Sequence, residues 1–243
     1  MDYRLTDRIG SRATLGLIVL QTDETLEHDF QRMFNAHDVA SYVSRVPSAA
    51  DVTPETLAAM EADLPRAASL LPPSLEFDAV GYGCTSGSTV IGPERVAELV
   101  RGAARVAAVS NPLSAVLAGL GALGVHRVAM VTPYIEAVTA PMRAVLQASG
   151  FEVVSCLSFE EAIEARVARI DPASIREAAI AAGQGEAEAV FLSCTNLRTL
   201  DVIDEIEAAL GKPVISSNQA LGWHMARLAG TVCDGRFGRL MRG

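Results

Sequence analysis

The stretch Asp78-Ala-Val-Gly-Tyr-Gly-Cys-Thr-Ser86 has a counterpart in Glu188-Ala-Val-Phe-Leu-Ser-Cys-Thr-Asn196. Each begins with an acidic residue and Ala-Val, continues through three further residues of an expected strand, and reaches Cys-Thr followed by a small polar residue. The two cysteines are 110 residues apart (84 to 194), and residues 15–22 resemble residues 125–132 at the same separation. Two matches in one register indicate an internal duplication.

Short apolar runs alternate with helical patterns on both sides of this repeat. Strands are expected at residues 14–20, 79–83, 127–132, 152–156, 189–193 and 213–216. Helices are expected at residues 25–36, 54–70, 93–103, 113–120, 135–148, 172–182, 200–210 and 221–228. This alternation predicts an α/β fold of two similar Rossmann-like (flavodoxin-like) lobes with parallel sheets, related by a pseudo-twofold axis. The predicted lobes are residues 1–112 with 217–243, and residues 113–216.

The composition favours a soluble globular protein and excludes several classes of partner. Of the 243 residues 50% are hydrophobic, and no uninterrupted apolar run approaches the roughly 20 residues that span a bilayer. The first ten residues are polar and lack the apolar core of a signal peptide, so we expect a cytoplasmic protein without a membrane partner. A net charge of −9 disfavours nucleic acid as a partner. A homodimer is the assembly that we expect.

The chain contains four cysteines, which are its candidate reactive side chains: Cys84, Cys156, Cys194 and Cys233. A reducing cytosol disfavours structural disulfides, and no cysteine or histidine spacing is typical of a metal site, so no metal is expected. Cys156 and Cys233 are interpreted as small apolar side chains. Cys84 and Cys194 each follow a predicted strand, and ligands of α/β sheets bind beyond such strand ends. Two similar lobes would therefore place both thiols in one cleft.

Two opposed thiols are suited to proton transfer at the carbon next to a carboxylate. Backbone amides at the following helix N-termini are expected to lower each thiol pKa toward neutrality. One thiolate would then remove a proton from one face of the carbon while the other thiol delivers a proton to the opposite face. The hydroxyls of Thr85, Ser86 and Thr195 are candidates to hold the substrate carboxylate. This chemistry requires no cofactor.

At this point the chain resembles the aspartate/glutamate racemase superfamily, in its branch of maleate cis-trans isomerases, arylmalonate decarboxylases and ectoine-utilisation racemase-like proteins. The most specific segment is Ser193-Cys-Thr-Asn-Leu-Arg-Thr-Leu-Asp-Val-Ile203, followed by residues 211–217; residues 122–135 and 164–170 are also similar. The resemblance implies two α/β lobes with a cofactor-free active site between them. It places Cys84 and Cys194 at the catalytic positions.

The same resemblance assigns substrate-binding roles to further residues. It implies that Thr85, Ser86 and Tyr134 hold the substrate carboxylate, and that Thr195 and Asn196 offer backbone amides from the second lobe.

Positions at which this chain differs from the patterns of the individual branches indicate which branch it resembles most. Arylmalonate decarboxylases carry glycine at the first cysteine position, so the presence of Cys84 favours two-sided proton transfer or cysteine addition over decarboxylation. Maleate isomerases carry Ser-Ser-Asn where this chain has Gln21-Thr22-Asp23, and an asparagine near Glu164. Two acidic residues would suit a substrate ammonium group, which resembles the ectoine-utilisation branch. Two simpler interpretations stay open, namely that Asp23 caps the helix expected at 25–36 and that Glu164 is a solvated helix residue.

The favoured function is therefore a two-cysteine racemase or isomerase acting on a small carboxylate, with a diaminobutyrate derivative or an aspartate- or glutamate-like amino acid as the expected substrate. The first alternative is maleate-type cis-trans isomerisation, in which Cys84 adds to the alkene. Further alternatives are an arylmalonate-type decarboxylase, a non-catalytic small-acid sensor, and a redox switch in which Cys84 and Cys194 form a disulfide.

Overall fold

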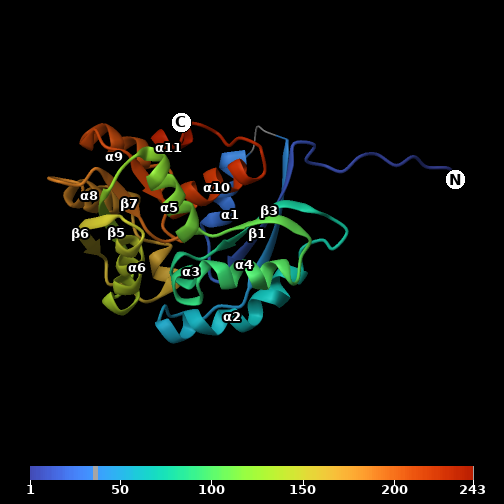
Figure 1. Ribbon diagram of the computed structural model, residues 1–243, viewed down its shortest axis with the longest axis horizontal. Helices are drawn as coiled ribbons and strands as arrows, with labels where there is room; N and C mark the ends of the chain where they lie inside the picture. The colour runs from blue at the N-terminus through green and yellow to red at the C-terminus, as the bar shows by residue number, and fades with distance from the viewer. Residues whose placement is uncertain (35–37, 243) are drawn as a thin grey trace.

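The computed structural model, which describes residues 1–34 and 38–242, contains two four-stranded parallel sheets flanked by helices (Figure 1). The first sheet has the order β2-β1-β3-β4, and the second has the order β6-β5-β7-β8. The strands are β1 (Ala13–Leu20), β2 (Val39–Val46), β3 (Phe77–Gly83), β4 (Val106–Ser110), β5 (Arg127–Thr132), β6 (Glu152–Ser158), β7 (Ala189–Leu192) and β8 (Val214–Ser216). Both sheets therefore follow one topology, which confirms the predicted fold class of two similar α/β lobes.

Eleven helices lie within the described residues. They are α1 (Leu26–Phe34), α2 (Pro54–Ser69), α3 (Thr85–Ile91), α4 (Pro93–Arg101), α5 (Pro112–Leu123), α6 (Glu136–Ala148), α7 (Glu164–Val167), α8 (Pro172–Ala182), α9 (Ile203–Leu210), α10 (Ser217–Leu228) and α11 (Arg239–Arg242). The end of the helix expected at 25–36 lies outside the described residues.

The sequence did not predict β2, β4, α3 or the two four-residue helices α7 and α11. β2 and β4 are edge strands whose side chains are partly exposed. β2 mixes polar with apolar residues, and the apolar run of β4 is short and rich in alanine, which has low strand propensity. The first helix expected after Cys84 was the one at residues 93–103, whereas α3 begins at Thr85, directly after Cys84. Its short Thr-Ser-Gly-Ser start has low helix propensity, and the Cys84 side chain caps it.

Buried central strands and two close backbone approaches position the site. All eight residues of β1 are buried, as expected for a strand covered on both faces. In β3, a Cβ atom at Gly81 would lie 2.5 Å from Sδ of Met225 on α10, and one at Gly83 would overlap the side chain of Leu26 on α1. Glycine at these positions lets both helices pack closely against the carboxyl end of β3.

Helix α10 connects the second sheet with the first. It begins at Ser217, directly after β8, and packs against β3 and α5. Figure 1 shows α10 between the two sheets. Its first residues, Ser217 and Asn218, are fully buried. They therefore reach strand ends that lie more than a hundred residues earlier in the chain.

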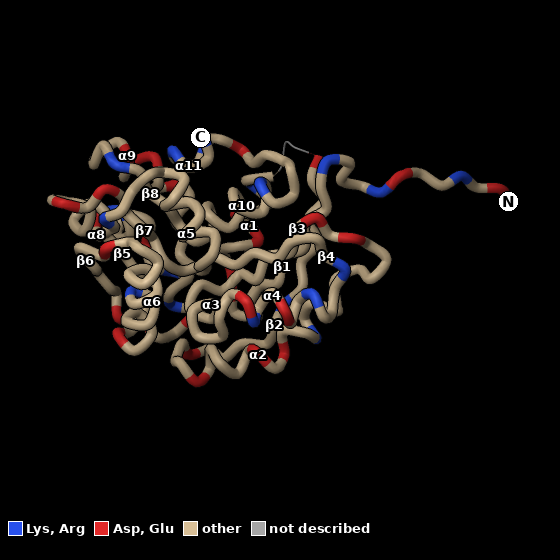
Figure 2. The backbone as a smooth tube through the Cα atoms, viewed as in Figure 1, with Lys and Arg blue, Asp and Glu red and all other residues tan. Residues whose placement is uncertain are grey.

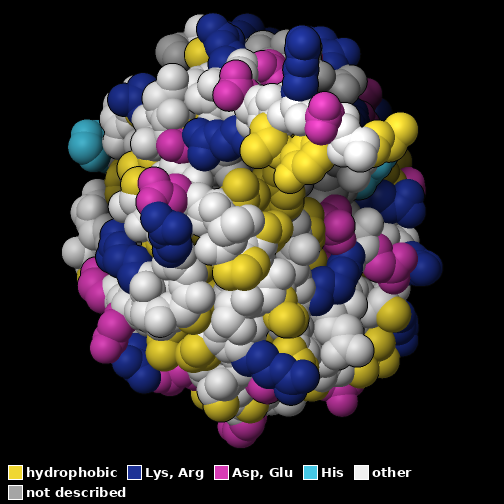
Figure 3. Space-filling view, turned by 90° about the vertical axis from the view of Figure 1, so that its right-hand side faces the viewer, with side chains coloured by type: hydrophobic (Ala, Val, Ile, Leu, Met, Phe, Trp, Pro, Cys, Tyr) yellow, Lys and Arg dark blue, Asp and Glu magenta, His cyan; other side chains and the backbone are white. Residues whose placement is uncertain are grey.

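The surface carries mixed charges over both lobes (Figure 2). An N-terminal segment projects from the first lobe, and Tyr3, Leu5 and Ile9 in it are exposed. Hydrophobic side chains lie among acidic and basic ones on the face from which it projects (Figure 3). Within the described ranges no helix has the length and apolarity needed to span a membrane.

Candidate active site

Cys84 and Cys194 occupy equivalent positions after β3 and β7, and each is only 2% exposed. Cys84 is the N-cap of α3, and its Sγ accepts a hydrogen bond from the backbone N–H of Gly87 at 3.1 Å. The Sγ of Cys194 accepts from the backbone N–H of Asn196 at 3.3 Å. Cys194 has a φ of 135°, a strained value for a residue with a side chain. Both thiols are thus held by backbone amides of their own loops.

Ser217 joins the two cysteine loops. Its Oγ accepts hydrogen bonds from the hydroxyl of Thr85 at 2.8 Å and from the backbone N–H of Cys194 at 3.1 Å. The hydroxyl of Thr195 donates to the carbonyl of Gly83, the residue before Cys84, at 3.3 Å. These contacts bring the strand ends of the two lobes together, as the internal repeat predicted.

Tyr134 lies beside both thiols, at the end of β5. It is 2% exposed, and its pKa is raised well above the usual value by burial and by the thiols of Cys194 and Cys84. Ser86, also buried, places its Oγ 3.7 Å from Sγ of Cys84. The structure therefore gathers Thr85, Ser86, Tyr134 and both cysteines in one enclosed cluster.

Asn196 links both lobes around this cluster. Its Oδ1 accepts from the backbone N–H of Glu24 at 2.9 Å, and its backbone carbonyl accepts from the hydroxyl of Thr25 at 3.0 Å. Its Nδ2 donates to a carboxylate oxygen of Glu164 at 2.8 Å and lies 3.4 Å from the carbonyl of Thr22. The side chain of Asn196 is therefore a cross-lobe connector in addition to the backbone role expected from the sequence.

Glu164 is a buried residue of the site, so its interpretation as a solvated helix residue was wrong. Its side chain is carried inward because the loop before α7 joins the loop after β2, with Glu164 N–H donating to Ala50 at 3.0 Å and Val52 N–H donating to Ala162 at 2.8 Å. Burial, opposed by the hydrogen bond from Asn196 and assisted by the charge of Asp23, raises the pKa of Glu164 to about 7.

Asp23 combines a capping contact with a place in the site. Its Oδ1 accepts from the backbone N–H groups of Thr25 and Leu26 at 2.9 and 2.8 Å, which confirms the helix-capping interpretation. Its Oδ2 is buried without a hydrogen-bond partner among the described residues. Burial raises the pKa of Asp23 to about 6. The free oxygen can therefore accept a hydrogen bond from a ligand.

The pKa values of the two thiols are higher than the sequence led us to expect. Burial raises the pKa of Cys84 to about 12, against the lowering effect of the Gly87 N–H. Burial and then the charge of Glu164 raise the pKa of Cys194 well above its usual value. The expected lowering by helix N-termini is outweighed because the site excludes water and contains carboxylates. Without a ligand both residues are therefore neutral thiols.

Three buried polar residues of the site were missed by sequence reasoning, namely Ser217, Asn218 and Asp29. Asn218 Nδ2 donates to Oδ2 of Asp29 at 2.7 Å and to the backbone carbonyl of Thr195 at 2.8 Å. Ser217 and Asn218 follow a predicted strand, so the strand-end rule used for the cysteines could have found them. Asp29 had no comparable signal, since it lies within an amphipathic helix.

Burial of Asp29 predicts a pH-dependent stability effect. Burial raises the pKa of Asp29 from 3.8 to about 7, so its contribution to stability is complete below about pH 4 and is lost as the pH rises through about 7. Asp29→Asn should therefore gain stability relative to the parent over this pH window, with an upper limit on the order of 4 kcal/mol. Urea unfolding of both proteins across the window measures the difference; an offset independent of pH would contradict the prediction.

No group of three or more His, Cys, Asp or Glu side chains suited to a metal ion occurs in the described part of the chain. The site instead consists of two thiols, hydroxyl and amide donors, and two carboxylates, all enclosed between two α/β lobes. These features define an enzyme with paired cysteines at equivalent strand ends.

Comparisons with known proteins agree with this class. The family model described as "Arylmalonate decarboxylase" matches residues 79–240, and the chain belongs to this family, within the aspartate/glutamate racemase superfamily. An arylmalonate decarboxylase of Bordetella bronchiseptica is 39% identical over 131 residues, which are 52% of this chain and 55% of that protein. The chain thus matches about half the length of that relative.

Maleate isomerases match over more of the chain. The maleate isomerase of Nocardia farcinica is 29% identical over 223 residues, 88% of each protein. A solved structure of a Nocardia farcinica maleate cis-trans isomerase, a cysteine-to-serine mutant with a covalently bound succinylcysteine intermediate, has a TM-score of 0.86. It is 26% identical to this chain and covers 95% of this chain and 98% of its own. The chain is therefore an enzyme of this family.

Proposed function

We propose that the protein is a two-cysteine cis-trans isomerase of a small unsaturated carboxylate, acting by maleate-type chemistry. The observation that carries this proposal is the presence of both Cys84 and Cys194, buried at equivalent strand ends, with Ser217 linking Cys194 to Thr85, the residue after Cys84. The maleate isomerases among the relatives favour this alternative over the amino-acid racemase that the sequence led us to prefer.

The reaction needs a nucleophile and an acid on neighbouring carbons. The Cys84 thiolate forms an S–C bond with one alkene carbon, and the π electron pair moves to the adjacent carbon, where the Cys194 thiol delivers its proton. The former double bond is now a single bond and rotates. The Cys194 thiolate then removes the proton, the double bond re-forms, and the S–C bond to Cys84 breaks. Atoms and charge are balanced, and no cofactor is consumed.

The surroundings match these roles. Because its pKa is raised, Cys194 is protonated and therefore holds the proton that the reaction requires. Cys84 must lose its proton before it adds, and Glu164 and Asp23, with pKa values of about 7 and 6, are the buried carboxylates available to accept it. Thr85, Ser86 and Tyr134, together with the Asn196 backbone amide, are the donors proposed to hold the substrate carboxylate.

A two-stage experiment tests this function. Maleate incubated with the protein in heavy water should give fumarate by NMR, and Cys194→Ser should accumulate a substrate adduct that peptide mass spectrometry locates on Cys84. Conversion without any adduct would contradict the covalent mechanism. Binding with neither conversion nor deuterium exchange would favour a small-acid sensor.

A second candidate, racemisation of an amino-acid-like substrate, is favoured by one observation. Asp23 and Glu164 place two buried carboxylates in the site, which suits a substrate ammonium group better than a second substrate carboxylate. The same assay in heavy water, run with both enantiomers of aspartate, glutamate, diaminobutyrate and N-acetyl-diaminobutyrate, distinguishes the two functions. Deuterium at the alpha carbon without maleate conversion would support the racemase; phenylmalonate tests decarboxylation in the same assay.

A further inference from the structure

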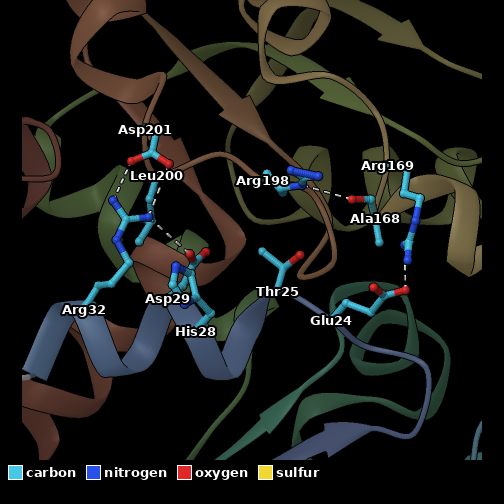
Figure 4. Close-up of a pocket in the computed structure, with 10 residues that line it drawn as sticks. All are labelled: Glu24, Thr25, His28, Asp29, Arg32, Ala168, Arg169, Arg198, Leu200 and Asp201. Carbon is cyan, nitrogen blue, oxygen red and sulfur yellow. Dashed lines mark hydrogen bonds and ion pairs between the residues drawn. The ribbon is translucent and has the colours of Figure 1, made fainter.

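A cavity of about 460 Å³ lies outside the cysteine cluster, at the junction of the two lobes (Figure 4). The first lobe contributes residues around the start of α1, among them Thr25, His28 and Asp29. The second lobe contributes residues that follow α7 and β7, among them Arg198. Neither cysteine lines the cavity, although Asp29, which contacts the candidate active site through Asn218, is part of its wall.

Two ion pairs cross between the lobes within the cavity wall. Arg32 pairs with Asp201 at 2.5 Å, and Arg169 pairs with Glu24 at 2.7 Å. Figure 4 shows these pairs on opposite sides of the cavity. Each exposed carboxylate of the wall is therefore already neutralised by an arginine from the opposite lobe.

Arg198 is the third arginine of the cavity wall and takes no part in these two ion pairs. Its Nε donates to the backbone carbonyl of Ala168 at 3.1 Å, and it makes no salt bridge with the described residues. The remaining carboxylate of the wall, Asp29, is buried and hydrogen-bonded to Asn218, and burial raises its pKa to about 7. Asp29 also lies 3.9 Å from Arg32. The wall thus contains three arginines and three carboxylates, and among the described residues Arg198 is the wall arginine whose guanidinium makes no salt bridge.

We propose that this cavity is a second binding site, for a small oxyanion such as a carboxylate or a phosphate, with the guanidinium of Arg198 as its main ligand. A guanidinium with free N–H groups binds planar or tetrahedral oxyanions through paired hydrogen bonds. His28 supplies a further polar ring at the cavity wall. None of the residues named for this site is among those proposed to contact the reacting atoms.

The wall of the cavity is continuous with the Cys194 loop. Thr25 donates to the backbone carbonyl of Asn196 at 3.0 Å. Asp29 holds Asn218, which holds the carbonyl of Thr195. An anion bound at Arg198 would contact both lobes beside these residues. It is therefore placed to change the reactivity of Cys194, which lies four positions earlier in the same loop.

The test uses Cys84→Ser protein, so that binding is measured without turnover. Inorganic phosphate and succinate are titrated separately while the guanidinium Nε–H signal of Arg198 is followed by NMR, with the signal assigned by its absence in Arg198→Gln. We expect a saturable shift of this signal. Calorimetry should show that Arg198→Gln weakens that binding at least tenfold, whereas Arg198→Lys weakens it less.

Arg176→Gln is the matched control, because Arg176 is an exposed arginine paired with Glu205 outside this cavity. It should bind as the parent does. Saturation by phosphate alone would identify a phosphate site, and saturation by succinate alone a carboxylate site; either supports the proposal. An Arg198 signal that does not respond to either anion, or equal binding by Arg198→Gln, would overturn it, and neither result depends on whether the enzyme isomerises maleate.

Discussion

Replacing Cys84 by alanine will lower the rate of cis-trans isomerisation by about 10⁴-fold or more, because no other group can form the S–C bond that turns the alkene into a rotatable single bond. The thiol is 2% exposed and is held by the Gly87 N–H, so no water molecule or neighbouring hydroxyl can take its position as a nucleophile without a new geometry. Steady-state assays measure the decrease in rate, with maleate or with the substrate that the NMR assays in heavy water identify.

The control for this variant is Cys156→Ala. Cys156 lies on β6, is half-buried, and lies outside the cluster formed by Cys84, Cys194 and Tyr134. The control should retain parental activity, which excludes a general effect of removing a thiol. Residual activity of Cys84→Ala within tenfold of the parent would contradict the covalent mechanism. That result would not bear on the fold or on the proposed second site at Arg198.

Replacing Asn196 by alanine will destabilise the protein by roughly 3 kcal/mol or more, the largest stability effect that we predict. Its side chain accepts from the part-buried N–H of Glu24, which lies in the other lobe, and donates to the buried carboxylate of Glu164. Alanine leaves both groups without a partner, and an unpaired buried charge is strongly unfavourable. Urea unfolding monitored by circular dichroism gives the difference in free energy.

Asn111→Ala is the comparison for this prediction. Asn111 is an equally buried asparagine, and its Oδ1 caps α5 by accepting from the backbone N–H of Ser114 at 3.0 Å. Loss of a helix cap costs about 1 kcal/mol. Equal destabilisation by the two substitutions would show that the link between Asn196 and Glu164 adds nothing to stability.

The architecture could be predicted from the sequence because it depends on local patterns. The apolar run at β1 and the repeated Ala-Val before each cysteine are signals that neighbouring residues carry, and the repeat alone implied two lobes of one topology. The edge strands β2 and β4 were not predicted because β2 mixes polar with apolar residues and the apolar run of β4 is short and alanine-rich. Cys84 and Cys194 were likewise found from their place at strand ends.

The sequence by itself thus determined two α/β lobes and a pair of cysteines at equivalent strand ends, because periodicity and strand-end position are encoded by adjacent residues. Only the tertiary structure decided the chemistry of that pair. The burial that raises the thiol pKa values, the inward position of Glu164, and the contacts of Ser217 with Thr85 and Cys194 all depend on segments distant in sequence. Desolvation and long-range hydrogen bonds depend on which segments pack around a group, and no local pattern specifies that.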